Sequence, residues 1–307
     1  MQIITQKETN STPIVGTIGM FDGVHLGHRS LIEHVQREAA SRNMASAVVT
    51  FASHPRSVLH PDKMMPLLNT NNERFHHLEM TGIDYVIVLN FTDELANFSA
   101  YEFIEYLHRQ YCLKALCIGY DHRFGHNRTE GFDDYCRHGK DIGVEIIQSH
   151  PYISQYGAIS SSFIRKNLLA GNTIQANEML GYDYYLTGSV IRGNQIGRKI
   201  GFPTANIAPE DTNKLIPANG AYAVKVELED GSIHNGMMNI GTRPTVANVN
   251  NLSIEVHLFD FIGDLYGKRL KIGFVSYLRP EQQFDSIESL TLALKSDRVK
   301  AMEMLQK

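Results

Sequence analysis

The apolar residues of this sequence change their spacing near residue 181, and no other feature limits the possible folds as strongly. From about residue 13 to 180, short apolar runs alternate with segments of helical spacing, which is typical of a parallel sheet covered by helices. The expected strands are Ile14–Phe21, Ala45–Phe51, Tyr85–Leu89, Leu113–Gly119 and Val144–Gln148. A helical stretch over Phe163–Leu180 follows them, and we predict that this half is doubly wound.

Beyond residue 181 the pattern predicts a small antiparallel barrel. Apolar residues alternate in Tyr222–Leu228 and again in Ile254–Leu258, as in strands with one buried face. A final helix is expected over Ser286–Leu305, and its buried face should carry Leu290, Leu294 and Met302. A chain of 307 residues is about twice the usual size of one domain, so we expect two. Their predicted extents are 1–182 for the α/β domain and 183–307 for the barrel with its helix.

Composition excludes several classes of partner. The formal net charge of -4 lacks the basic excess that binding to nucleic acid normally requires. No stretch approaches the ~20 apolar residues of a membrane span, and the N-terminus has no basic start followed by an apolar run, so a cytoplasmic protein is expected. Cys112, Cys117 and Cys136 are interpreted as reduced thiols buried as small hydrophobes, with a zinc site as the alternative.

The first candidate site is the segment Gly19–His28, which joins the first expected strand to the first helix. Ligands bind at such carboxyl ends of parallel strands, and a helix N-terminus supplies free N–H groups for phosphate. Gly23 and Gly27 permit close approach of the backbone. His25 and His28, three residues apart, can reach one phosphate group and stabilise charge during its transfer. A surface histidine pair or half a metal site is the alternative that these two residues alone leave open.

This segment resembles the H-x-G-H signature of the nucleotidyltransferase superfamily, whose domains are Rossmann-like. Its sequence FDGVHLGH is similar to the form found in bacterial FAD synthetases. The chain lacks the glycine-rich loop with lysine of a P-loop kinase. The resemblance implies catalytic roles for His25 and His28, and ATP binding by Gly19, Phe21, Asp22 and Gly27.

Two further segments after expected strands fit the same family. Thr50–Pro55 resembles the T-F-x-x-H-P element near the flavin, which implies flavin contacts for His54 and Pro55, although Ala52 and Ser53 depart from the family pattern. Gly119–Gly125 resembles a G-x-D-F-R-F-G turn, with His122 in place of phenylalanine. There the resemblance implies that Asp121 binds ATP, whereas an aspartate that fixes its own turn is the alternative.

The segment Ile159–Arg165 opens the last helical stretch of this half. By itself a serine run at a helix start is usually an N-cap. The segment resembles the nucleotidyltransferase motif I-S-S-T-x-I-R, with Ser162 in place of threonine. The resemblance implies that Ser161, Ser162 and Arg165 hold ATP phosphates.

The second candidate site lies in the segment Gly188–Asn206. Thr204 and Asn206 offer two oxygen ligands on one face of a strand, which suits Mg²⁺, although a lone P-T-x-N is usually a turn. The segment resembles the riboflavin kinase signature through G-R-x-x-G-F-P-T-A-N. That resemblance implies a loop that closes on ATP and includes Gly193, Gly197, Arg198, Lys199, Gly201 and Pro203.

Glu255 is the expected proton acceptor of the second site. The strand period places Glu255 and His257 opposite the apolar residues of Ile254–Leu258, where a glutamate alone would usually be solvated surface. The surrounding IEVHLFDFIGDLYGK resembles the riboflavin kinase segment that carries the catalytic glutamate. Arg279 and Phe284 match a family element that implies flavin contacts.

The resemblance runs from about residue 12 to 302, in the two-module order of bacterial FAD synthetases. It implies an enzyme that phosphorylates riboflavin to FMN and adenylylates FMN to FAD, with ATP as co-substrate of both steps and Mg²⁺ as the metal. Riboflavin, FMN and FAD would be substrates and products. Two alternatives stay open: an enzyme with only one of the activities, and a flavin-sensing protein without turnover. The sequence does not define an oligomeric state.

Overall fold

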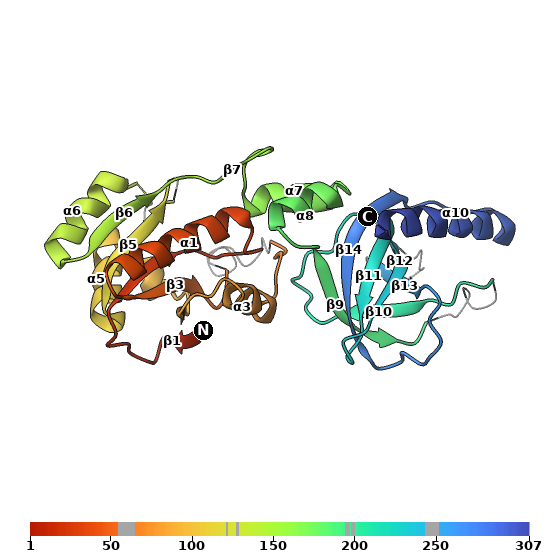
Figure 1. The fold of residues 1–307 in the computed structure, drawn as a ribbon, viewed down its shortest axis with the longest axis horizontal. Helices are drawn as coiled ribbons and strands as arrows, with labels where there is room; N and C mark the ends of the chain where they lie inside the picture. The colour runs from red at the N-terminus through yellow and green to blue at the C-terminus, as the bar shows by residue number, and fades with distance from the viewer. Residues whose placement is uncertain are drawn as a thin grey trace. The chain divides into compact units, whose positions relative to one another are not determined.

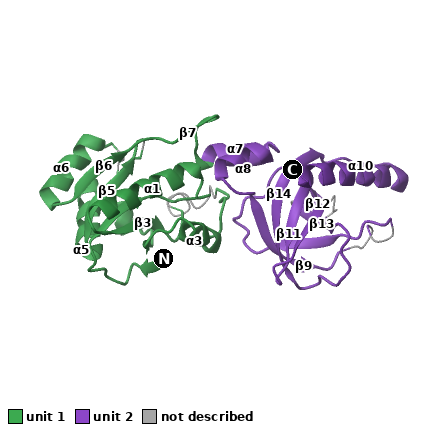
Figure 2. Cartoon of the chain, viewed as in Figure 1, with its two compact units in different colours: residues 1–161 green, residues 162–307 purple. Residues whose placement is uncertain are grey.

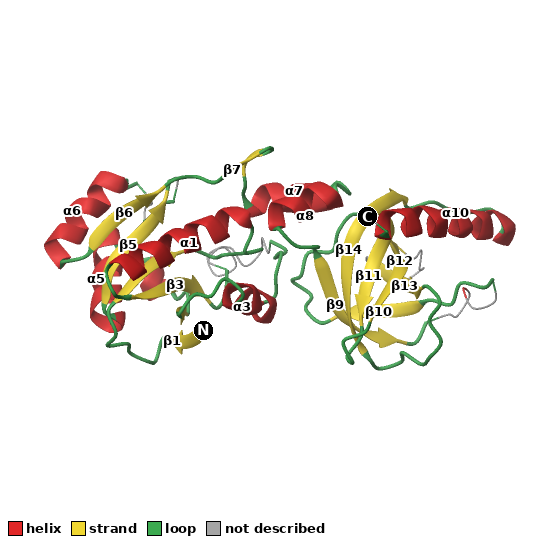
Figure 3. Cartoon of the chain, in the orientation of Figure 1, coloured by secondary structure: helices red, strands yellow, loops and turns green. Residues whose placement is uncertain are grey.

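The computed structural model describes residues 1–54, 65–120, 122–126, 129–193, 197, 200–242 and 252–306. The chain forms two compact units, residues 1–161 and 162–307 (Figure 2). Helices and strands alternate in the first unit, whereas the second consists mainly of strands with a long helix at its end (Figure 3). The predicted change of architecture along the chain is therefore confirmed.

The first unit contains a six-stranded parallel sheet with the order β1-β4-β3-β2-β5-β6 (Figure 1). Its strands are β1 (Gln2–Thr5), β2 (Ile14–Ile18), β3 (Ala45–Phe51), β4 (Tyr85–Leu89), β5 (Leu113–Gly119) and β6 (Glu145–Ser149). The chain runs outward from β2 through β3 to β4 and then returns to place β5 on the other side of β2. The carboxyl ends of β2 and β5 therefore flank a topological switch point, where open α/β sheets bind ligands.

Helices cover both faces of this sheet, as the strand periodicity requires. They are α1 (Leu26–Ser41), α3 (Asn71–Glu79), α4 (Asp93–Ala96), α5 (Ala100–Tyr111) and α6 (Phe132–Ile142). Val15 and Val48 pack in one core with Val35 of α1. Their strand neighbours pack in the other core, with α5 and α6, because successive side chains point to opposite faces. The doubly wound prediction is confirmed, while β1, a short and largely exposed edge strand, was not expected.

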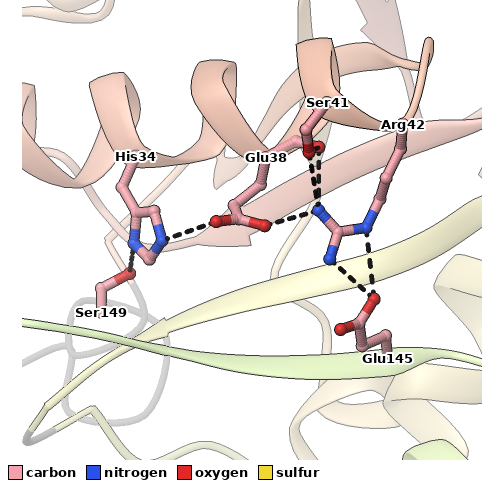
Figure 4. Close-up of polar contacts among 6 residues, drawn as sticks. All are labelled: His34, Glu38, Ser41, Arg42, Glu145 and Ser149. Carbon is pink, nitrogen blue, oxygen red and sulfur yellow. Dashed lines mark hydrogen bonds and ion pairs between the residues drawn. The ribbon is translucent and has the colours of Figure 1, made fainter.

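A chain of polar contacts fastens α1 to β6 (Figure 4). His34 Nδ1 lies 2.7 Å from Ser149 Oγ, and its Nε2 lies 3.2 Å from Glu38. Arg42 bonds Glu38 and also donates to Glu145 at 2.9 Å. The hydrogen bond from Arg42 holds the pKa of Glu38 below its ordinary value. Because these side chains are partly exposed, each ion pair contributes at most about 1 kcal/mol to stability.

The second unit is built around a closed antiparallel barrel with the order β10-β13-β12-β11-β14-β9. Its strands are β9 (Tyr185–Ile191), β10 (Ala205–Pro209), β11 (Gly220–Glu227), β12 (Ile233–Thr242), β13 (Leu252–Leu258) and β14 (Arg269–Pro280). The predicted alternation is confirmed, since Tyr222, Val224, Ile254 and Val256 are all buried. A short hairpin of β7 (Ile153–Ser154) and β8 (Gly157–Ala158) precedes this unit.

The C-terminal helix α10 (Ile287–Leu305) packs on the outside of the barrel. Leu294, Ala301 and Leu305 contact a core that includes Ala223 of β11. The expected burial of Met302 was wrong, because its side chain is 40% exposed. The packing face continues from Leu294 to residues 297, 301 and 305, and Met302 lies one residue beyond that face.

Two helices connect the hairpin to the barrel where one helical stretch was expected. They are α7 (Ser161–Leu169) and α8 (Thr173–Leu180), separated by a turn in which Gly171 has a φ of +79°. Asn177 of α8 donates to the carbonyl of Phe274 at 2.7 Å, and Leu168 of α7 accepts from Ala218 at 3.1 Å. Both helices therefore group with the barrel, and the units divide at 161/162. The domain boundary at 182/183 stays a prediction.

The cysteines lie on separate elements. Cys117 is fully buried in the core of the first unit, where burial raises the pKa of its thiol to about 12. Cys112 follows α5 in a left-handed conformation, and Cys136 lies on α6. Within the described residues, no group of three His, Cys, Asp or Glu side chains is placed to hold a metal. No helix in the described ranges is long and apolar enough to cross a membrane.

We predict that residues 162–307, expressed alone, melt at least about 4 °C higher than residues 183–307. The shorter fragment loses the hydrogen bond to Phe274 and the burial of Leu168 and Leu180. Each such leucine is worth about 1.5–3 kcal/mol, and 1 kcal/mol shifts the melting temperature of a domain of this size by roughly 3–6 °C. Circular dichroism melting measures the difference. Equal melting temperatures would instead support a boundary at 182/183.

Candidate functional site

The turn between β2 and α1 is held in a costly backbone conformation. Phe21 has a φ of +52°, Gly23 of +87° and Val24 of +36°. Positive φ is uncommon for residues other than glycine and is unfavourable for a β-branched residue. Such conformations persist only where the surroundings impose them, and they cluster at functional sites. The turn predicted to bind phosphate therefore has a backbone conformation of the kind found at functional sites.

His25 and His28 lie together at the end of this turn. His25 is the N-cap of α1, and its Nδ1 accepts a hydrogen bond from the backbone N–H of His28 at 3.3 Å. The two rings stack with centroids 3.6 Å apart, and the ring of Phe21 lies 5.0 Å from that of His28. A Cβ on Gly27 would come within 3.2 Å of the His25 ring, so glycine leaves room for the stack. Both predicted catalytic histidines thus occupy one place.

The surroundings of His28 keep its imidazole neutral. Burial lowers its pKa well below the ordinary value, and electrostatic repulsion from His25 and His122 lowers it further. His28 Nδ1 has no hydrogen-bond partner within the described part of the chain. His122 comes from the segment after β5, so the strand ends on both sides of the switch point contribute to the electrostatic environment of His28. A neutral imidazole can donate a hydrogen bond to an incoming phosphate group from its protonated ring nitrogen.

Asp22 and Ser161 bind backbone groups around the turn. The Asp22 carboxylate accepts from the N–H groups of Leu68 and Asn69 at 2.9 and 3.1 Å. Ser161 Oγ donates to the carbonyl of Asp22 at 2.8 Å, so the start of α7 contacts a turn 139 residues away. Both predicted ATP ligands thus help to shape the turn. Gly19 also belongs to it, and a Cβ there would lie 3.0 Å from the Phe21 ring.

Of the remaining predicted site residues, some lie in the described part of the chain and others do not. Arg165 is 8% exposed, and its Nη1 donates to Ser162 Oγ at 3.4 Å within the second unit. His54 is half-buried just after β3. Pro55 and Asp121 lie outside the described residues, as do Arg198 and Lys199 of the predicted kinase loop.

The second cluster is assembled by the register of the barrel. Asn206 of β10 pairs with Glu255 of β13, which also pairs with Asn239 of β12. Thr204 Oγ1 donates to Glu255 Oε2 at 3.0 Å, and Ser253 Oγ donates to Oε1 at 3.1 Å. A carboxylate, two hydroxyls and two carboxamides are therefore adjacent. The predicted base and the predicted metal ligands are brought together.

Glycines make room around this cluster. A Cβ on Gly193 would lie 2.1 Å from the side-chain amide of Asn206, and one on Gly197 would lie 2.2 Å from the carbonyl of Phe202. Gly201 has a φ of +83° and makes the turn before Pro203. Close approach therefore explains glycine at positions 193 and 197, and the positive φ explains it at position 201.

His257 bonds the segment that carries Thr204. Its Nδ1–H donates to the carbonyl of Pro203 at 2.7 Å, next to Thr204. The side chain is only 7% exposed and packs against Phe202, so this face of β13 is covered rather than solvated. Burial lowers the pKa of His257 below its ordinary value. The sequence placed His257 beside Glu255 without a role, and the i+2 spacing on one strand face was the signal for it.

Thr204 and Asn206 fit a magnesium ion. Their donors are a hydroxyl and a carboxamide, hard oxygen ligands of the kind that Mg²⁺ prefers, and both residues lie beside Glu255. The space that a Cβ on Gly193 would fill lies directly against Asn206. Mg²⁺ keeps several of its waters and needs only a few protein ligands, so these two are sufficient.

Arg279 and Phe284 lie together, and Arg279 forms an ion pair with the C-terminal helix. The Arg279 guanidinium binds the carboxylate of Asp297 at 2.8 Å and 3.0 Å, and it lies 5.6 Å from the Phe284 ring centre. Asp297 is only 3% exposed, so this ion pair docks α10 on β14. Their contact with flavin stays a prediction.

One buried residue near the first site carried no sequence signal. Arg74 of α3 is 2% exposed and bonds the carbonyls of Met20 and Phe51 at 2.9 and 2.7 Å. Helical arginines are usually solvated, and no motif marks this one. Its partners are far away in sequence, so only the fold reveals it.

Comparison with known proteins assigns both units. The family model described as FAD synthetase matches residues 7–163, and the model described as riboflavin kinase matches residues 180–305. A protein of Streptococcus pneumoniae whose structure is titled a macrolide-efflux protein shares the fold, with a TM-score of 0.89 and 29% identity. That match covers 98% of this chain and 99% of the other.

Relatives of similar length carry both activities in their name. The bifunctional riboflavin kinase/FMN adenylyltransferase of Haemophilus influenzae is 37% identical over 92% of this chain and 91% of its own. The protein of the same name from Escherichia coli (strain K12) is 35% identical over 94% of this chain and 91% of its own. The resemblance inferred from the sequence motifs is confirmed. The chain belongs to the family of bifunctional riboflavin kinases/FMN adenylyltransferases.

Proposed function

We propose that the two polar clusters divide the two reactions of this enzyme between them. The chain is a transferase that phosphorylates riboflavin to FMN and adenylylates FMN to FAD. The observation that supports the division is that each unit holds its own cluster, and each cluster falls within one of the two matched family models. ATP is the co-substrate of both reactions.

In the kinase reaction Glu255 accepts the proton of the riboflavin 5′-hydroxyl as its oxygen attacks the γ-phosphorus of ATP. The bond from that phosphorus to the β,γ-bridging oxygen breaks, and ADP leaves. The hydrogen bonds from Thr204 and Ser253 hold the carboxylate in one orientation. Thr204 and Asn206 would hold Mg²⁺, which neutralises phosphate charge when it is bound. The glycine loop, with Gly193 and Gly197, would lie over the ATP phosphates.

In the adenylyltransferase reaction an oxygen of the FMN phosphate attacks the α-phosphorus of ATP. The bond from that phosphorus to the bridging oxygen of the β-phosphate breaks, and pyrophosphate leaves. His25 and His28 stabilise the charge that builds on the phosphates, together with the free N–H groups of α1. Triphosphate binding by Ser162 and Arg165, which belong to the second unit, stays a prediction from their motif. No covalent enzyme intermediate is required.

We also infer that the protein works in the cytoplasm and that its partners are these small molecules. All three cysteines are free thiols, which fits a reducing compartment. The net charge of -4 offers no general attraction for nucleic acid. A time course of flavins formed from riboflavin, ATP and Mg²⁺, separated by chromatography, tests the function as a whole. A flavin sensor would form neither FMN nor FAD. An enzyme with the kinase activity alone would form only FMN from riboflavin, and one with the adenylyltransferase alone would form FAD only from supplied FMN.

We predict that His28→Ala lowers FAD formation by about 10²- to 10³-fold, because one stabilising group of the transition state is removed. FMN formation from riboflavin should be unchanged, since the kinase cluster lies in the other unit. The measurement is the initial rate of each product with the same protein sample. Equal loss of both activities in folded protein would contradict separate sites.

Glu255→Gln should have the opposite selectivity. Glutamine keeps the size of glutamate and can still accept a hydrogen bond from Thr204, but it cannot take up a proton near neutral pH. We expect FMN formation to fall by about 10²- to 10⁴-fold, as for loss of a general base. FAD formation from supplied FMN serves as the folding control. A kinase rate within a factor of about three of wild type would remove Glu255 from the mechanism.

The titration of His28 gives a test that does not depend on activity. Its depressed pKa means that the native state favours the neutral ring, so its contribution to stability is present above pH 6.5 and is lost as the pH falls through the lower folded value. Bound ATP should raise this pKa, because nearby negative charge favours the protonated form. NMR titration, with His28→Ala to assign the signal, measures both values. A midpoint at or above 6.5 without ATP, or no change with ATP, would contradict the assignment.

A further inference from the structure

Arg74 is a buried arginine that links the two strand ends of the first site. Its Nη1 donates to the carbonyl of Met20 at 2.9 Å, and its Nη2 donates to the carbonyl of Phe51 at 2.7 Å. Met20 lies in the turn that leads to His25, and Phe51 is the last residue of β3. The guanidinium therefore joins the carboxyl ends of two neighbouring parallel strands.

The helix that carries Arg74 is itself tied to these two segments. Asn71 Oδ1 accepts from Arg74 Nη2 at 3.0 Å, while Asn71 Nδ2 donates to the carbonyl of Ala52 at 2.9 Å. Thr70 caps α3 through a capping box with Glu73. The first turn of α3 is thus attached to the segment that leads from β3 to His54.

The negative charge of Asp22 also helps to hold the turn against the start of α3. Asp22, in the turn, favours the charged form of Arg74 and accepts the backbone N–H groups of Leu68 and Asn69, just before α3. Burial lowers the pKa of Arg74 to about 10, so the guanidinium stays protonated at neutral pH. Arg74 of α3 therefore bonds a carbonyl of the turn, and Asp22 of the turn bonds N–H groups just before α3.

The cost of this arrangement argues against a simple packing role. A charged group that is 2% exposed must replace its hydration with hydrogen bonds, and an apolar side chain would fill the same space without that penalty. Arginine can satisfy two carbonyls on two strands at once because its donors form a rigid planar fork. Lysine carries all its donors on one nitrogen and cannot reproduce the two separate nitrogens that bond the two carbonyls here.

We propose that Arg74 is a positioning residue for adenylyl transfer: it fixes the turn that carries His25 and His28 against the strand end that leads to His54. This inference rests on the proposed function of the first unit. A misplacement of about 1 Å can cost 10²-fold in rate, so loss of the fork should lower kcat for FAD formation even in folded protein.

The test compares Arg74→Met with Arg42→Met in the full chain. Arg42 is a matched control, because it also bonds two partners in the first unit but joins α1 to β6 away from the turn (Figure 4). We expect Arg74→Met to lower kcat for FAD formation from FMN by at least about tenfold, with smaller changes in KM for ATP and FMN. FMN formation from riboflavin should stay at the wild-type rate in both variants. Arg42→Met should form FAD within about twofold of wild type, as expected for a surface substitution.

Arg74→Lys keeps the proposal testable where Arg74→Met fails to fold. It retains the charge and most of the volume but loses the planar fork whose two nitrogens bond the two carbonyls, so kcat should lie between those of wild type and Arg74→Met. The NMR signal of the His28 ring should shift in both Arg74 variants and stay unchanged in Arg42→Met. That readout also separates failure of this inference from failure of the proposed function, since it needs no FAD formation.

A merely structural arginine would give other results. It would leave kcat per folded molecule within about threefold of wild type, or it would lower FAD formation equally in Arg74→Met and Arg42→Met. An unmoved His28 signal in the Arg74 variants would overturn the proposal as well.

Discussion

The turn between β2 and α1 has to be held in place, because Phe21 and Val24 adopt left-handed backbone conformations that cost free energy. The groups that hold it come from all along the first unit. Arg74 bonds the Met20 carbonyl, Ser161 bonds the Asp22 carbonyl, and the Asp22 carboxylate binds backbone N–H groups before α3. These contacts hold the turn that leads into α1, where the two histidine rings stack. The site therefore exists only when β2, β3, α3 and the start of α7 are all in place.

In the barrel, the register of the strands positions the polar cluster around Glu255. The cluster lies on neighbouring antiparallel strands, where cross-strand register decides which side chains are adjacent. A shift of one residue would turn Glu255 into the barrel and Val256 out of it, because side chains alternate along a strand. Burial of Ile254 and Val256 therefore fixes the orientation of the carboxylate. Stability and chemistry depend on the same register in this unit.

Buried polar side chains fix the path of the chain in both units. In the first, buried charges such as Arg74 and Asp22 bond backbone groups, which fixes the path of the chain. In the second, the buried pair of Arg279 and Asp297 docks α10 on the barrel, and His257 holds the Pro203 carbonyl. Several of these side chains match no role in a family motif. They nevertheless determine where the motif residues stand.

The sequence by itself determined the two architectures, the family and most of the candidate site residues. Strand and helix periodicity is a local property, and the strings FDGVHLGH and GFPTAN are contiguous, so neither needs distant contacts to be read. What only the tertiary structure decided was the grouping of α7 and α8 with the barrel, the exposure of Met302, and the contacts of Arg74, Asp22 and His257. These depend on pairs of residues far apart along the chain. A one-dimensional pattern carries no record of such pairs, because the packing of the folded chain alone brings their atoms within bonding distance.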